Sequence, residues 1–196
     1  MANLQALCAL LLAVSTAATR RNLRFGMMHG EDTITFDDVD TCLQVWSDGI
    51  VTIGSVYQEG GDYTAAAKTH INDLYAYDVV EDPNSVLFKP TLASEVPFRP
   101  TFGGALSYFV ADPSEEGYID EDNGFAIAPY TAVRYEIPGV FIDSDSATAM
   151  GEYWFTGLDG NETKVEYTFQ YMMNSDPTTD CKLKIVTHHS SLPYTP

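Results

Sequence analysis

The first clear pattern along the chain is a helical stripe of apolar residues. Their spacing of three and four residues brings their side chains to one face of a helix. The stripe comprises Phe36, Val39, Leu43, Trp46, Ile50 and Ile53. Thr35 precedes it, and with Asp38 three residues later it resembles the start of a capping box. We therefore predict a helix over residues 36–57.

A second helix is predicted directly after this one. Gly60-Gly61 interrupts the chain, and Asp62 is a residue type that caps helix starts. The residues that follow place Ala67, Ile71 and Leu74 on a common face. We predict that this helix covers residues 63–77.

After Asp82-Pro83-Asn84 the pattern changes to that of β-strands. Apolar and polar residues alternate most clearly within residues 164–171, as in a half-buried strand. Turn-forming residues separate the apolar stretches. We predict strands over residues 86–89, 105–111, 126–136, 147–156, 164–172 and 182–189.

Helices followed by a run of strands indicate the α+β class. The helices must cover one face of a curved, mostly antiparallel sheet, because each element has one apolar face to bury. The full length of 196 residues suits one such domain. We assign it to residues 33–196, with no internal repeat.

The N-terminal segment has a different character from the domain. Its first 18 residues are uncharged and contain an apolar stretch followed by small residues, and Arg20, Arg21 and Arg24 come next. This pattern favours a cleaved leader to the secretory route or a plastid. An amphipathic helix of the mature protein is the alternative. The apolar stretch, of about eleven residues, is too short to span a bilayer. We assign residues 1–32 to this leader and a linker.

The charge balance excludes some classes of partner. The chain has 28 acidic and 10 basic residues, a formal net charge of -18. Nucleic acids and anionic membrane surfaces require basic patches, so we expect neither as a partner. A neutral small molecule would not be repelled by this charge.

Histidine and cysteine, the usual ligands of zinc, are few and scattered. The three cysteines have no C-x-x-C spacing, and there are only four histidines. Adjacent His188 and His189 cannot readily reach one metal from a strand. We therefore expect no metal cofactor, with manganese or zinc as the alternative. For Cys42 and Cys181 we prefer two buried thiols, and a disulfide between them is the alternative.

The last predicted strand carries the most distinctive polar residues, His188-His-Ser-Ser191. Alternate residues of a strand share a face. Leu183 and Ile185 are apolar, so their face should point into the core, with His189 and Ser191 at its end. His188 and Ser190 should point outward. A frayed, solvated strand end is the alternative interpretation.

Several segments together resemble the iota-class carbonic anhydrases. They are Val86-Leu-Phe-Lys-Pro-Thr91, Phe98-Arg-Pro-Thr101, Ala105-Leu-Ser-Tyr-Phe-Val110, Met150-Gly-Glu-Tyr-Trp-Phe-Thr156, Lys164-Val-Glu-Tyr-Thr-Phe169 and His188-His-Ser-Ser-Leu-Pro193. The resemblance runs from about residue 35 to the C-terminus. It extends to the kinase association domains and SnoaL-like proteins, and implies a cone-shaped α+β barrel that forms a homodimer. The implied activity is the interconversion of carbon dioxide and bicarbonate.

The resemblance also implies a set of site residues. Thr91, Tyr108, His189 and Ser191 match the positions that contact bicarbonate, with His188 and Ser190 in support. Thr101 is the alternative for the threonine, since it also follows a proline. Histidine is a natural base or proton shuttle near neutral pH, and hydroxyls can hold the nascent anion.

Two other functions are alternatives to this enzyme. A non-catalytic association domain would use the same fold for oligomerisation, but no kinase domain precedes it in this sequence. A SnoaL-like isomerase or hydrolase would need a carboxylate base on an apolar strand face, and none is evident.

Overall fold

The structure is a computed structural model that describes residues 33–78 and 86–196. Three helices, α1 (Phe36–Gln58), α2 (Tyr63–Leu74) and α3 (Phe102–Val110), accompany one five-stranded sheet. The strands are β1 (Leu87–Lys89), β2 (Tyr130–Asp143), β3 (Ser146–Gly157), β4 (Glu162–Met173) and β5 (Leu183–Ser191). Short 3₁₀ turns, η1 (Ala76–Asp78) and η2 (Phe125–Ile127), complete the set. The predicted leader and linker, residues 1–32, lies outside the described residues and stays a prediction.

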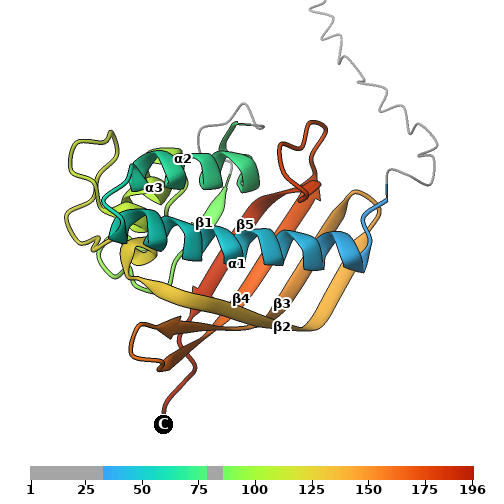
Figure 1. Ribbon diagram of the computed structural model, residues 1–196. Helices are drawn as coiled ribbons and strands as arrows, with labels where there is room; N and C mark the ends of the chain where they lie inside the picture. Colours follow the sequence, from blue (N-terminus) through green and yellow to red (C-terminus); the bar gives the residue numbers. More distant parts are fainter. Residues whose placement is uncertain (1–32, 79–85) are drawn as a thin grey trace, which may run out of the picture.

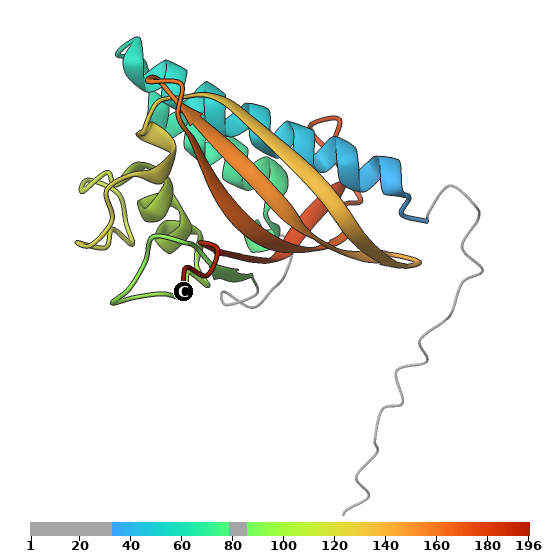
Figure 2. The ribbon, with the colours of Figure 1, turned by 90° about the horizontal axis from the view of Figure 1, so that it is seen from below.

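The sheet is antiparallel except at one edge. Its strand order is β1-β5-β4-β3-β2, and β1 pairs with β5 in parallel. Helix α1 lies across one face of the sheet, with α2 and α3 grouped near the end that carries β1 (Figure 1). Seen from below, the long strands curve around this helical layer (Figure 2). The predicted α+β class with a curved, mostly antiparallel sheet is confirmed.

Helix α1 forms as its sequence predicts. The Thr35 hydroxyl accepts from the Asp38 backbone N–H, and the Asp38 carboxylate accepts in turn from the Thr35 N–H. Such a reciprocal cap satisfies two N–H groups that the first turn would otherwise leave unpaired. The predicted stripe is buried from Val39 to Ile53, whereas Phe36 is exposed. Helix α2 is capped by Asp62 as expected, and ends at Leu74 because Tyr75 is extended.

The prediction of a strand over residues 105–111 is wrong, because this segment is most of helix α3. Thr101 caps its start, and Ala111 ends it in the left-handed conformation. Seven consecutive residues of α3, from Gly104 to Val110, are buried. A helix buried on nearly all sides has no polar face and so lacks the periodicity that would identify it.

A disulfide joins Cys42 of α1 to Cys181, two residues before β5. Our preference for two free thiols is therefore wrong. Both residues are buried, and the bridge closes a loop with a sequence separation of 139 residues. The spacing of the two cysteines did not reveal this pairing, because only the docking of β5 beneath α1 brings them together.

We expect the double change Cys42→Ser and Cys181→Ser to lower the free energy of unfolding by about 2–5 kcal/mol, since it frees a long loop in the unfolded chain. Urea denaturation with and without a reductant would measure it. Reductant should destabilise the wild-type protein and leave the double variant unchanged. Equal stabilities of the oxidised wild-type protein and the double variant would contradict this expectation.

Candidate active site

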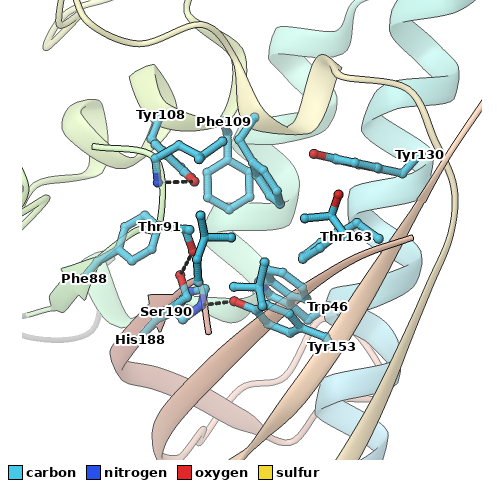
Figure 3. Close-up of a pocket in the computed structure, with 15 residues that line it drawn as sticks. Trp46, Phe88, Thr91, Tyr108, Phe109, Tyr130, Tyr153, Thr163, His188 and Ser190 are labelled. Atoms are coloured by element: carbon cyan, nitrogen blue, oxygen red, sulfur yellow. Dashed lines mark hydrogen bonds between the residues drawn. The ribbon is translucent and has the colours of Figure 1, made fainter. Parts of the chain in front are cut away.

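A small, largely apolar cavity lies between the helices and the sheet, with a volume of about 60 Å³. This space holds a few molecules of the size of water. Its wall includes eight apolar side chains: Trp46, Phe88, Leu92, Phe109, Phe125, Phe155, Val165 and Leu192. Seven polar side chains complete it: Thr91, Tyr108, Tyr130, Tyr153, Thr163, His188 and Ser190. Figure 3 shows the hydroxyls of this group facing one another across the cavity.

His188 and Ser190 line this cavity, whereas His189 and Ser191 lie on the outer face of the sheet. The two pairs lie on opposite faces as expected, but our prediction that His189 and Ser191 face the core and that His188 and Ser190 point outward is wrong. The cause is a β-bulge in β5. Residues 185 and 187 pair with neighbouring residues of β4, so Val186 is an extra residue that reverses the alternation after it. Leu183 and Ile185, before the bulge, are buried as expected.

Thr91 lies in the cavity, as predicted, and its hydroxyl donates to Ser190 Oγ at 2.9 Å. The alternative, Thr101, does not line the cavity, because its hydroxyl caps helix α3 by accepting from the Gly104 N–H. The short pairing of β1 beside β5 places Thr91, two residues beyond β1, next to Ser190.

One carboxylate binds three backbone N–H groups of the loop after Thr91. Glu121 accepts backbone N–H bonds from Ser94, Glu95 and Val96, at 2.9, 2.9 and 2.7 Å. These bonds lower the pKa of Glu121 to about 2, the bond from Glu95 contributing most. The carboxylate is therefore ionised at any working pH, and it fixes the loop that carries Thr91 and Leu92.

Tyr108 also lies in the cavity, as predicted, although it comes from a helix and not from a strand. Its hydroxyl accepts from the Leu92 backbone N–H at 3.4 Å (Figure 3). Burial raises the pKa of Tyr108 well above its usual value, so the phenol keeps its proton. Its position on α3 is supported by the neighbouring Ser107, which donates to Asp122 at 2.6 Å.

The His188 ring is enclosed by aromatic side chains and two phenols. Phe88 and Phe169 stack on it with centroid distances of 4.9 and 4.1 Å. Tyr75 Oη is 2.8 Å from Nδ1, and Tyr153 Oη is 3.3 Å from Nε2. Both ring nitrogens therefore have a hydrogen-bond partner inside the protein.

Burial determines the protonation state of His188. It lowers the pKa of His188 to about 3, and the neighbouring His189 contributes in the same direction. The ring is thus neutral near pH 7 and a poor acceptor for a bulk proton. Burial also raises the pKa of Tyr153 well above its usual value. At neutral pH, none of these described side chains of the cavity is charged.

Sequence reasoning missed Trp46 as a cavity residue, and it missed Tyr153 and Tyr75 altogether. A signal existed for Tyr153, since it shares strand parity with Ala149 and Phe155, which are both buried. Trp46 was assigned to the core stripe, and its ring stacks on Tyr153 at 5.4 Å. Tyr75 directly follows the end of helix α2, where the alternation of a strand does not predict which way a side chain points.

The described residues offer no obvious metal site. Within residues 33–78 and 86–196, no group of three or more His, Cys, Asp or Glu could hold an ion. The cavity wall contributes a single imidazole and no carboxylate to such a site. Among the helices described, none is long and apolar enough to cross a membrane.

The fold and cavity define a class of protein: an α+β domain that encloses a small, uncharged cavity lined by aromatic rings and hydroxyls. The sequence model of the metal-independent carbonic anhydrases matches residues 37–192. A metal-independent carbonic anhydrase from Nostoc sp. (strain PCC 7120) is 38% identical over 164 residues. This alignment covers 82% of the chain and 75% of the Nostoc protein. The chain therefore belongs to the metal-independent carbonic anhydrase family.

One solved structure agrees with this assignment. The iota-carbonic anhydrase from a cyanobacterium, complexed with bicarbonate, superimposes with a TM-score of 0.74 at 36% identity. The match covers 84% of this chain and 96% of that one. A putative calcium/calmodulin-dependent protein kinase II association domain from Xanthomonas campestris matches with a TM-score of 0.48 at 20% identity, over 85% and 97% of the two chains.

Acid should destabilise the fold through two buried histidines, His188 and His70, whose pKa values burial lowers to about 3. The folded state binds these protons more weakly than the unfolded state, so stability falls as the pH drops from 6.5 towards 3. Each histidine should cost about 2 kcal/mol of unfolding free energy between pH 7 and pH 5.

Urea denaturation of His188→Gln at both pH values tests this expectation. The loss of unfolding free energy between pH 7 and pH 5 should be smaller in this variant than in the wild-type protein by about 2 kcal/mol. His189→Gln is the matched control, because it makes the same change at the neighbouring, exposed ring on the outer face, and the acid-induced loss of unfolding free energy should be smaller in His188→Gln than in this control. An unchanged loss in His188→Gln would contradict the assigned burial.

Proposed function

We propose that the cavity between α1, α3 and the sheet is where this carbonic anhydrase hydrates carbon dioxide. The observation that carries the proposal is the convergence of four hydroxyls, from Thr91, Tyr108, Tyr153 and Ser190, on one apolar space. Carbon dioxide is neutral and poorly hydrated, so an apolar wall favours its entry. Hydroxyls can both donate and accept, which suits binding of the water and of the product oxygens.

The hydroxyls supply the anion-stabilising part of the reaction. The water oxygen bonds to the carbon while one C=O electron pair moves onto oxygen, so negative charge develops on the oxygens of carbon dioxide. Donors held in advance at those oxygens lower the barrier, because they need no reorganisation during the reaction. Tyr108 and Tyr153 remain protonated and can act as such donors.

The proton of the attacking water must also move. The lowered pKa of His188 argues against our expectation that a histidine in this cavity is the base. The Thr91–Ser190 pair, 2.9 Å apart, offers a neutral route. One hydroxyl accepts the proton from water while the pair gives up another to the oxygen of the substrate. The product is carbonic acid, which releases its proton to solvent to give bicarbonate, and no side chain becomes charged.

His188 and Ser190 replace His189 and Ser191 in this proposal. The change follows from the bulge at Val186, which places the second pair on the outer face. The residues we propose to contact carbon dioxide or bicarbonate are Thr91, Tyr108, Tyr153 and Ser190, with His188 holding Tyr153.

Ser190→Ala and Tyr108→Phe should each lower kcat for carbon dioxide hydration by about 100- to 1000-fold, since each removes one donor to the developing anion. Stopped-flow measurement with a pH indicator would give the rates. Ser191→Ala is the matched control, because it changes the neighbouring serine on the outer face and should affect kcat little. A larger loss in Ser191→Ala than in Ser190→Ala would refute the proposed site.

We also propose that the enzyme is a homodimer, as the family resemblance implies. Phe141 and Met150 support this, since both lie on the outer face of the sheet and are 70% and 58% exposed. Changing both to Asp should convert the dimer to a monomer in sedimentation velocity experiments. Tyr194→Asp, near the C-terminus, is the control and should leave the dimer intact. A wild-type monomer at micromolar concentration would contradict the proposal.

A further inference from the structure

A line of hydrogen bonds runs from helix α1 to the cavity. Trp46 Nε1 donates to Tyr75 Oη at 3.0 Å, and Tyr75 Oη is 2.8 Å from His188 Nδ1. His188 Nε2 is 3.3 Å from Tyr153 Oη, which faces the cavity (Figure 3). Tyr75 does not line the cavity, and the proposed reaction leaves it without a role.

The direction of this line is determined at its buried end. An indole N–H can only donate, so Tyr75 Oη must accept from Trp46. Tyr75 has one proton of its own, and among the described residues His188 Nδ1 is its only hydrogen-bond partner apart from Trp46. The Tyr75 side chain is completely buried, so an unused hydroxyl proton there would be costly. Tyr75 therefore donates to Nδ1.

The direction then passes through the imidazole ring. A neutral imidazole carries one proton, so an Nδ1 that accepts leaves the proton on Nε2. Nε2–H donates to Tyr153 Oη, so the phenolic proton of Tyr153 does not go to His188 and can be donated on the cavity side, where Ser190 also lies. The opposite tautomer would make Tyr153 donate to His188 and turn only lone pairs towards the cavity, where they would repel the oxygens of bicarbonate.

We propose that Tyr75 is a positioning residue that holds His188 in the Nε2–H tautomer, so that Tyr153 presents a proton to the developing anion. This inference rests on the proposed function of the cavity. It adds to that proposal Tyr75, a residue outside the cavity wall. The indole N–H of Trp46, which can only donate, determines the direction of the hydrogen bonds that follow. Burial raises the pKa of Tyr75 well above its usual value, so its proton stays in place at neutral pH.

The tautomer can be observed directly by ¹⁵N NMR of protein labelled in its histidine rings. The His188 signals are identified by their absence in His188→Gln. In the wild-type protein we expect Nδ1 without a proton and Nε2 with one. A proton on Nδ1 in the wild-type protein would overturn the proposal without any recourse to activity, and it would leave the proposed function standing.

Tyr75→Phe tests the role of the hydroxyl. Removing the donor to Nδ1 should give a mixture of tautomers and lower kcat by about 10-fold, with little change in KM. Tyr77→Phe is the matched control, because it removes a half-buried phenol that donates to the Arg99 carbonyl at 2.8 Å and has no hydrogen bond to His188. It should leave both the tautomer and kcat unchanged.

The outcomes separate the two proposals. Unchanged His188 signals and unchanged kcat in Tyr75→Phe would refute the positioning role. An equal loss of kcat in Tyr75→Phe and Tyr77→Phe, with the tautomer retained in both, would also refute it, since a general loss of packing would then be the cause. Failure of the proposed function would instead appear as an unaffected kcat in Ser190→Ala.

Discussion

One extra residue in β5 determines which side chains enter the cavity. Up to Ile185 the strand presents its odd-numbered residues to the core, and after the bulge at Val186 it presents His188 and Ser190. β5 is bonded on both sides, to β1 and β4, so this register is fixed by two neighbours at once. Phe88 and Phe169, from those two neighbours, then clamp the His188 ring between them.

The cavity that we propose as the active site is built from neutral groups. Enclosure by aromatic rings removes the charge from His188 and keeps the protons on Tyr108 and Tyr153. A metal enzyme activates water by lowering its pKa. Here the available means are the orientation of hydroxyl dipoles and the exclusion of bulk water, which strengthen each hydrogen bond to a developing charge. The polarity of the Trp46–Tyr75–His188 line serves the same purpose, because a neutral group acts only through the direction of its dipole.

Sequence patterns predicted the parts of the fold that depend on local order. The cap at Thr35, the stripe of α1 and the alternation of β4 follow from spacing alone, and all are present. The α+β class followed from the order of the elements. The family resemblance predicted Thr91 and Tyr108 as cavity residues, and both line the cavity. Tyr108 does so from helix α3, which the sequence analysis predicted as a strand.

The errors arose where distant contacts override local order. No local residue marks the bulge at Val186, because it is a shift in the register between β5 and β4. Helix α3 is buried on nearly all sides, so its sequence has no polar face to reveal a helix. The Cys42–Cys181 bridge depends on the docking of β5 under α1. The contact of Tyr75 with His188 could not be predicted either, because the two residues are 113 positions apart in the sequence.

β5 is the last element of the domain in chain order, and this order has a consequence for folding. β5 supplies His188 and Ser190, and Cys181 just before it closes the bridge to α1. A nascent chain that lacks this strand has helices and a hairpin sheet but neither the cavity nor the bridge. Folding of the domain must therefore wait until β5 has left the ribosome, and contacts between such distant parts of a chain form slowly. Until then the edge of β4 that pairs with β5 stays open, and this late step is where a folding helper would have most to protect.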